Sequence, residues 1–73
     1  MSRFTATNEK GERYAYGYDR PLAEYFLQKG GIELVGNLSN KPGNHSNMLQ
    51  AITDEKVQIP QEHKDAIILD LPF

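Results

Sequence analysis

The chain has 73 residues, no cysteine, and a formal net charge of −2 from 8 basic and 10 acidic side chains. This length allows a single domain, and the lack of cysteine excludes disulfides and thiolate metal sites. Residues 1–8 lack the apolar segment of a signal peptide, and no apolar run approaches the roughly 20 residues of a membrane span. The sequence therefore predicts a soluble, cytoplasmic protein that does not associate with membranes.

The N-terminal residues 1–11 are polar, end in a Glu-Lys-Gly sequence, and contain only Phe4 as an anchoring side chain. They predict a loose polar leader. Residues 12–73 are then expected to form one small domain.

The most informative segment is residues 12–18, in which a tyrosine occupies every second position: Tyr14, Tyr16 and Tyr18. A period of two with a β-favouring residue type predicts a strand with one tyrosine-rich face. The sequence Asp-Arg-Pro at 19–21 predicts a turn, because aspartate bonds to nearby backbone and proline fixes its own φ.

Residues 22–28 fit two patterns, since their apolar side chains recur both at helical spacing and at alternate positions. The aromatic pair Tyr25-Phe26 and the preceding strand favour a second strand, and the alternative is a helix that starts at Pro21. After two glycines, residues 32–36 predict a third, short strand. Together the segments predict an antiparallel β-meander over about residues 12–36.

The second half of the chain predicts two helices. Residues 37–47 contain Pro-Gly and four asparagines, which indicate a loop. One helix is expected at about 46–53, after an asparagine or serine cap. Another is expected at about 60–70, because a proline and acidic residues are typical of the first turn of a helix. Strands followed by helices predict an α+β fold with both helices on one sheet face. The predicted core consists of Tyr16, Phe26, Leu34, Met48, Leu49, Ile52, Ile67 and Leu71.

The tyrosine face suggests two kinds of binding function. Phenol rings can stack on bases or small ligands, and two arginines lie beside them in the sequence. This gives the alternative prediction of a single-stranded nucleic-acid or small-ligand binder that uses Tyr14, Tyr16, Tyr18, Arg13 and Arg20. Stacking platforms normally line a positively charged groove, however, and this chain is slightly acidic. The favoured prediction is therefore a protein–protein interaction or regulatory module.

Neither catalysis nor metal binding is predicted. Cysteine is absent, no serine lies in a G-x-S-x-G sequence, and Gly30-Gly31 is not followed by the residues of a phosphate-binding loop. The two histidines, His45 and His63, lack the ligand spacing of a metal site. We expect a protein that is not an enzyme and that holds no cofactor or metal.

The segment from Tyr16 to Phe26 reads YGYDRPLAEYF. It resembles the opening of a group of small uncharacterised bacterial proteins that share a Y-G-x-D-x-P-L-x-x-[YF]-[FY] motif, and residues 59–70 resemble their closing helix. The resemblance implies no activity. It implies that the turn containing Asp19 and Pro21 organises the two strands around it.

The expected partner is an unknown protein or a second copy of the chain. A chain this short buries only about 60% of its unfolded surface when it folds alone. The predicted strand around Tyr25-Phe26 is apolar on both faces, unlike a sheet with one face in water. A three-stranded sheet also has two edges that need covering. These points predict a homodimer, with a monomer as the alternative.

Overall fold

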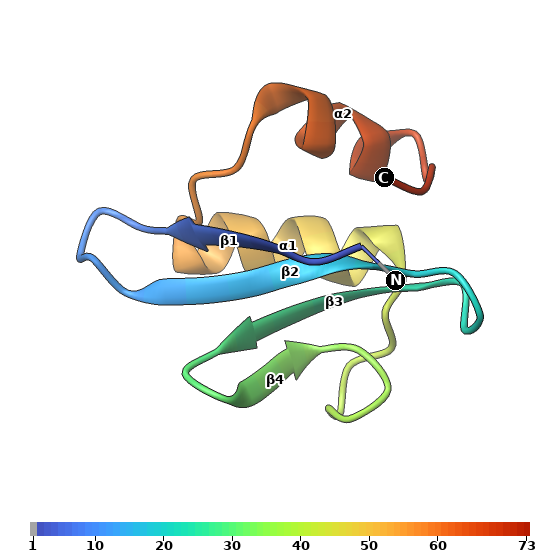
Figure 1. The fold of residues 1–73 in the computed structure, drawn as a ribbon, viewed down its shortest axis with the longest axis horizontal. Coiled ribbons are helices and arrows are strands. Elements are labelled where there is room, and N and C mark those ends of the chain that lie inside the picture. The colour runs from blue at the N-terminus through green and yellow to red at the C-terminus, as the bar shows by residue number, and fades with distance from the viewer. Residues whose placement is uncertain (1) are drawn as a thin grey trace.

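A computed structural model describes residues 2–73 as a four-stranded antiparallel sheet followed by two helices (Figure 1). The strands are β1 (Phe4–Thr7), β2 (Arg13–Asp19), β3 (Glu24–Lys29) and β4 (Ile32–Val35), and they lie in this order across the sheet. The helices are α1 (His45–Glu55) and α2 (Gln61–Ile68). The grouping of strands before helices confirms the predicted α+β fold.

Both helices lie on the same side of the sheet. Helix α1 packs against β3, β4 and α2, and Figure 1 shows it running behind the strands with α2 beside β1. On α2, the His63 ring contacts Phe4 and Tyr16 from the first two strands. The opposite side of the sheet carries no helix and is called the open face below.

The first strand corrects the prediction of a polar leader. Residues Phe4–Thr7 pair with β2, and Phe4 lies opposite Tyr16. The apolar side chains of β1 pack against the core, while its threonines alternate to the open face. The amide of Gln58 donates to the carbonyl of Thr7 at 2.9 Å, which partly covers the outer edge of β1. The meander therefore has four strands rather than three.

The third strand shows that the alternative of a helix starting at Pro21 is wrong. Strands β2 and β3 are antiparallel, with Gly17 opposite Phe26. In the turn between them Ala23 adopts a left-handed φ of 53°. A strand is favoured here because the side chains of β3 then alternate between two covered surfaces. One set faces the helices, and the other set faces a covered part of the open face.

Local capping explains where the helices begin and end. At the start of α1 the Asn44 side chain accepts from the amide of Asn47 at 2.8 Å, and Lys56 ends the helix with a φ of 56°. Pro60, with a φ of −56°, precedes α2. Both helices are confirmed, although α1 extends beyond its predicted bounds and α2 is shorter.

Among residues 2–73, no helix combines the length and apolar character that crossing a membrane requires.

The hydrophobic core lies between the sheet and the helices. Four predicted members are confirmed as buried there, and two others, Leu34 and Leu49, are partly buried. Six side chains that the prediction omitted also belong to this core. The confirmed residues are Tyr16, Met48, Ile52 and Ile67, and the omitted ones are Tyr14, Tyr25, Leu27, Val35, Ala51 and Val57.

Two predicted core residues lie elsewhere. Leu71 is 49% exposed, because α2 ends at Ile68 and the chain turns at Asp70, which has a φ of 58°. Phe26 is buried, but on the open face, since it alternates with the residues of β3 that face the helices. The open face thus carries one buried aromatic ring.

Candidate functional site

The tyrosine face lies beneath the helices and does not form a binding surface. Tyr14 and Tyr16 are 2% and 1% exposed, and Tyr18 is partly buried against the same core. A ring in this position cannot stack on a base, so the predicted stacking site is wrong for the first two tyrosines. Arg13 and Arg20 are exposed. Arg13 alternates with the tyrosines along β2, so its side chain lies on the open face and not beside the tyrosine rings.

The buried tyrosine hydroxyls bond to distant parts of the chain. The Tyr14 hydroxyl donates to Glu55 Oε1 at 2.7 Å. The Tyr25 hydroxyl donates to the carbonyl of Leu71 at 2.8 Å. Each bond joins a strand to a helix or to the segment after it, so these phenols contribute to the fold.

Burial of these phenols predicts a loss of stability in alkali. Burial and the Glu55 carboxylate raise the pKa of Tyr14 to about 12, and burial and Asp70 raise the pKa of Tyr25 to about 12. In the unfolded chain tyrosine ionises near pH 10. The contribution of the two buried, neutral phenols to the free energy of unfolding is therefore complete below about pH 10. It is lost as the pH rises to about 12.

Urea unfolding at a series of alkaline pH values measures this loss. Tyr14→Phe should show a shallower decline of the unfolding free energy with pH than the wild type, because one buried phenol is removed. An identical decline in both proteins would contradict the assignment.

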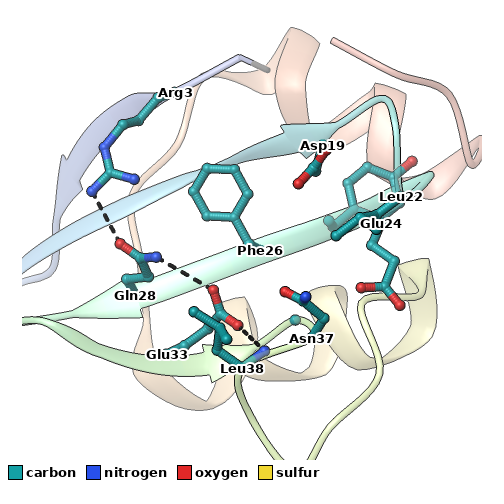
Figure 2. Close-up of a pocket in the computed structure, with 11 residues that line it drawn as sticks. Arg3, Asp19, Leu22, Glu24, Phe26, Gln28, Glu33, Asn37 and Leu38 are labelled. Carbon is teal, nitrogen blue, oxygen red and sulfur yellow. Dashed lines mark hydrogen bonds between the residues drawn. The ribbon is translucent and has the colours of Figure 1, made fainter.

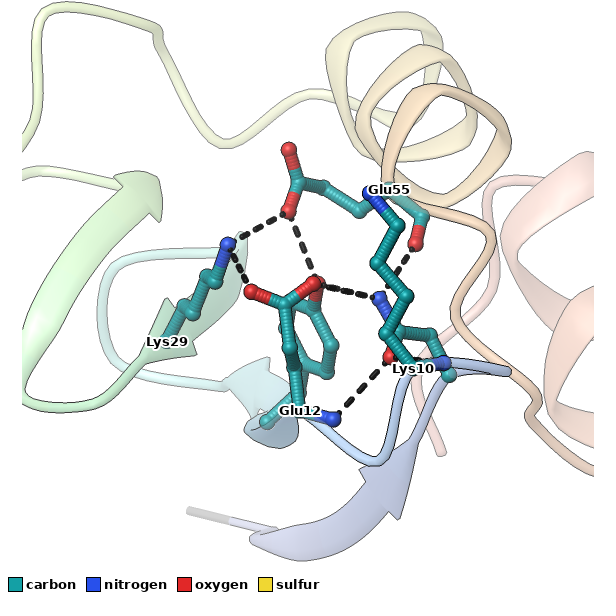
Figure 3. A network of polar contacts seen from close by, with 6 residues as sticks. Lys10, Glu12, Lys29 and Glu55 are labelled. Carbon is teal, nitrogen blue, oxygen red and sulfur yellow. Dashed lines mark hydrogen bonds and ion pairs between the residues drawn. The ribbon is translucent and has the colours of Figure 1, made fainter.

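A polar network joins the β1–β2 loop to β3 and α1 (Figure 3). The buried Asn8 side chain donates to Glu12 Oε1 at 2.8 Å and accepts from the amides of Lys10 and Glu12, each at 3.0 Å. The Lys29 ammonium forms ion pairs with Glu12 and Glu55. Pairing with Lys29 and bonding to Asn8 hold the pKa of Glu12 below its usual range. Because Glu12, Lys29 and Glu55 are paired with one another, the network ties the β1–β2 loop, β3 and α1 together.

The two histidines lie in different surroundings. His63 Nδ1 and the Tyr16 hydroxyl share a hydrogen bond of 2.6 Å, and the His63 ring is stacked on Phe73 with centroids 4.9 Å apart. His45 Nδ1 lies 3.6 Å from Asp70 Oδ1 near the surface. Within residues 2–73, no three side chains of metal-ligating type are grouped to hold an ion.

A cavity of about 130 Å³ lies on the open face beside the β2–β3 turn (Figure 2). We call it the open-face pocket. It is lined by Arg3, Asp19, Leu22, Glu24, Tyr25, Phe26, Gln28, Glu33, Gly36, Asn37 and Leu38.

One wall of the open-face pocket is a chain of hydrogen bonds across the sheet. Arg3 Nη2 donates to Gln28 Oε1 at 3.0 Å, and Gln28 Nε2 donates to Glu33 Oε1 at 3.3 Å. The amide of Leu38 donates to the other oxygen of Glu33 at 2.6 Å. These bonds, drawn in Figure 2, hold the polar wall and the loop after β4 in fixed positions.

The Phe26 ring lies at the centre of the open-face pocket (Figure 2). Its partner across β2 is Gly17, whose missing side chain leaves room for the ring and for the backbone of Ser2. The Arg3 guanidinium carbon lies 5.8 Å from the ring centroid, a distance at which a cation is attracted to an aromatic face. Phe26 is only 6% exposed as a result.

The other side of the open-face pocket is acidic. Asp19 and Glu24 are cross-strand neighbours where β2 ends and β3 begins. Among the residues that the structure describes, none forms an ion pair with either carboxylate. Glu24 Oε2 is enclosed by protein and has no hydrogen-bond partner in the described part of the chain.

Only one feature of the sequence indicated this pocket. The apolar character of Tyr25-Phe26 on both strand faces indicated that something must cover Phe26. The cover comes from the chain itself, through Arg3 and Ser2. Searches of protein-family models, curated proteins and solved structures gave no match to this chain. The functional argument therefore rests on the residues of the pocket.

Proposed function

We propose that the chain is a protein–protein interaction or regulatory module that binds its partner at the rim of the open-face pocket. Two leucines support this proposal. Leu22 is 49% exposed and Leu38 is 79% exposed, and both line the same pocket. Single exposed apolar side chains are ordinary, but apolar groups beside a polar, hydrogen-bonded wall have the character of an interface.

The position of Leu38 strengthens the argument. Its amide is held by Glu33, and two further bonds of the same loop, from Gly36 to Lys41 at 2.9 Å and from Ser39 to Gly36 at 3.2 Å, restrict the backbone around it. A rigid, exposed leucine loses little conformational freedom on binding.

The charge of the pocket argues against the nucleic-acid alternative. Its lining has one basic residue, Arg3, and three acidic ones, Asp19, Glu24 and Glu33, which gives a balance of −2. A phosphate backbone would be repelled from such a surface. A protein partner with apolar and basic side chains is the better match.

The homodimer is the case in which the partner is a second copy. Phe26 does not support it, because the ring is already covered within one chain. The remaining support is the small size of the domain and the position of β4 at the edge of the sheet, where Ile32 is 68% exposed.

A double variant, Leu22→Ser with Leu38→Ser, tests the proposed surface. Partner proteins retained from host extract by the immobilised wild type should be lost with this variant. Light scattering at concentrations of tens of micromolar, in the same series, shows whether the partner is a second copy with twice the 8.3 kDa mass of one chain.

The matched control is Leu69→Ser, which removes a leucine that is 66% exposed beyond α2. It should retain the same partners as the wild type. Identical retention by the wild type and the double variant, with a monomeric mass for both, would contradict the proposal.

A further inference from the structure

We infer that the open-face pocket binds the guanidinium group of an arginine side chain that belongs to a partner protein. The inference rests on the proposed function and specifies the chemistry of the partner. The group would lie beside the Phe26 ring and toward the acidic side formed by Asp19 and Glu24 (Figure 2).

The first argument is the unbalanced charge on this side of the pocket. Asp19 and Glu24 are opposite one another in the strand register, a placement that is unfavourable for two like charges. In Figure 2 their carboxylates diverge from one another on the two sides of Leu22. No cation among the described residues pairs with them.

The second argument is the enclosed oxygen of Glu24. Oε2 has no hydrogen-bond partner in the described part of the chain and is shielded by protein. A shielded carboxylate oxygen without a partner is unfavourable, and a donor from a ligand would relieve this cost. Glu24 lines the pocket, so a rotation of its carboxylate would bring this oxygen to a donor bound there.

The third argument is that the other two charged side chains of the pocket, Arg3 and Glu33, already form hydrogen bonds. The Arg3 guanidinium donates to Gln28. Both oxygens of Glu33 accept hydrogen bonds, one from Gln28 and one from the amide of Leu38. Glu33 also carries a negative charge, but both of its oxygens already accept hydrogen bonds, whereas Glu24 has an oxygen without a described partner.

The geometry of a carboxylate favours a guanidinium over other cations. The Phe26 ring is already covered, and its cationic partner is Arg3, 5.8 Å from the ring centroid. A planar guanidinium can donate two parallel hydrogen bonds to one carboxylate, which an ammonium group cannot. A cavity of about 130 Å³ is close to the roughly 150 Å³ that holds a benzene molecule, so it suits a single end group of this kind.

A metal ion is a poorer match. Divalent cations that prefer oxygen take six or more ligands, whereas residues 2–73 bring no three His, Cys, Asp or Glu side chains together. In Figure 2 the two carboxylates point away from one another, so they do not converge on a single ion.

The test is a titration of the isotope-labelled full chain with N-acetylarginine amide, followed by amide chemical shifts. The matched probe is N-acetylcitrulline amide, which has the same shape and no charge. We expect saturable shifts around Asp19, Glu24 and Phe26 with the arginine probe only, and weaker binding as salt is added.

Asp19→Asn and Glu24→Gln should each weaken binding of the arginine probe by about tenfold, the effect of losing one charge-assisted hydrogen bond. Glu62→Gln, in the exposed first turn of α2, should bind like the wild type. The urea midpoints of the two pocket variants should equal or exceed that of the wild type, because neither carboxylate has a described ion-pair partner. A large fall in either midpoint would show that the carboxylate serves the fold and would overturn the inference.

Equal shifts with the citrulline probe, shifts outside the pocket, or unchanged binding in both pocket variants would also overturn it. The Leu22→Ser and Leu38→Ser double variant distinguishes a failure of the arginine site from a failure of the proposed function. If that variant loses the partner while the arginine probe shifts nothing, the interaction module stands and the arginine site is wrong.

Discussion

Tyr16→Ala should lower the free energy of unfolding by about 3–5 kcal/mol, as aromatic truncations in protein cores do. The ring is 1% exposed and contacts Phe4, His63 and Phe73, with centroid distances of 5.7, 5.7 and 6.0 Å. Domains have only about 0.05–0.15 kcal/mol of stability per residue. The variant should therefore be largely unfolded at ambient temperature, as measured by urea titration with circular dichroism.

Tyr16→Phe is the matched control. It retains the ring and removes only the hydroxyl that bonds to His63 Nδ1 at 2.6 Å. The expected loss is about 1 kcal/mol. A Tyr16→Ala variant with the urea midpoint of Tyr16→Phe would show that the ring is not part of a tightly packed core.

Gly43→Ala is expected to cost about 3 kcal/mol, the upper part of the usual range for an added methyl group without space. A Cβ at this position would overlap the carbonyl oxygen of Tyr25 and lie 2.8 Å from Cβ of Glu24. The Gly43 carbonyl also accepts from the Tyr25 amide at 2.8 Å. The loop before α1 therefore approaches β3 too closely for any side chain, and urea unfolding measures the loss.

Gly17→Ala offers the comparison. Its Cβ would overlap the carbonyl oxygen of Ser2, but Ser2 precedes the first strand and can move away if its bonds to Tyr18 break. We expect a loss of about 2 kcal/mol, roughly 1 kcal/mol for each of the two bonds. If Gly17→Ala proves the more damaging of the two, the backbone contact at Gly43 is less rigid than the structure indicates.

The strands and helices were predictable where one face is apolar over several residues. The alternating tyrosines of β2 and the proline before α2 each act locally, so their patterns appear in the sequence. β1 also alternates, since Phe4 and Ala6 pack inward. It was missed because four residues give too short a pattern to separate from a polar leader.

The open-face pocket was not predictable, because its residues come from separate segments of the chain. Arg3 reaches Gln28 across the sheet, 25 positions away in sequence. The pairing of β3 with β4 shifts in register between Leu27 and Gln28, so that Gln28 lies opposite Glu33. A register shift of this kind depends on the assembled sheet, and the sequence carries no local sign of it.

The aromatic cluster near the C-terminal end of the described chain has a consequence for synthesis on the ribosome. Phe73 stacks on Phe4 with centroids 5.8 Å apart and on His63 and Tyr25 as well. The first strand is therefore translated long before the ring that packs against it. At about 5–20 residues per second, the nascent hairpin must wait for several seconds with its phenols uncovered, and chaperones that recognise aromatic surface have that interval in which to bind.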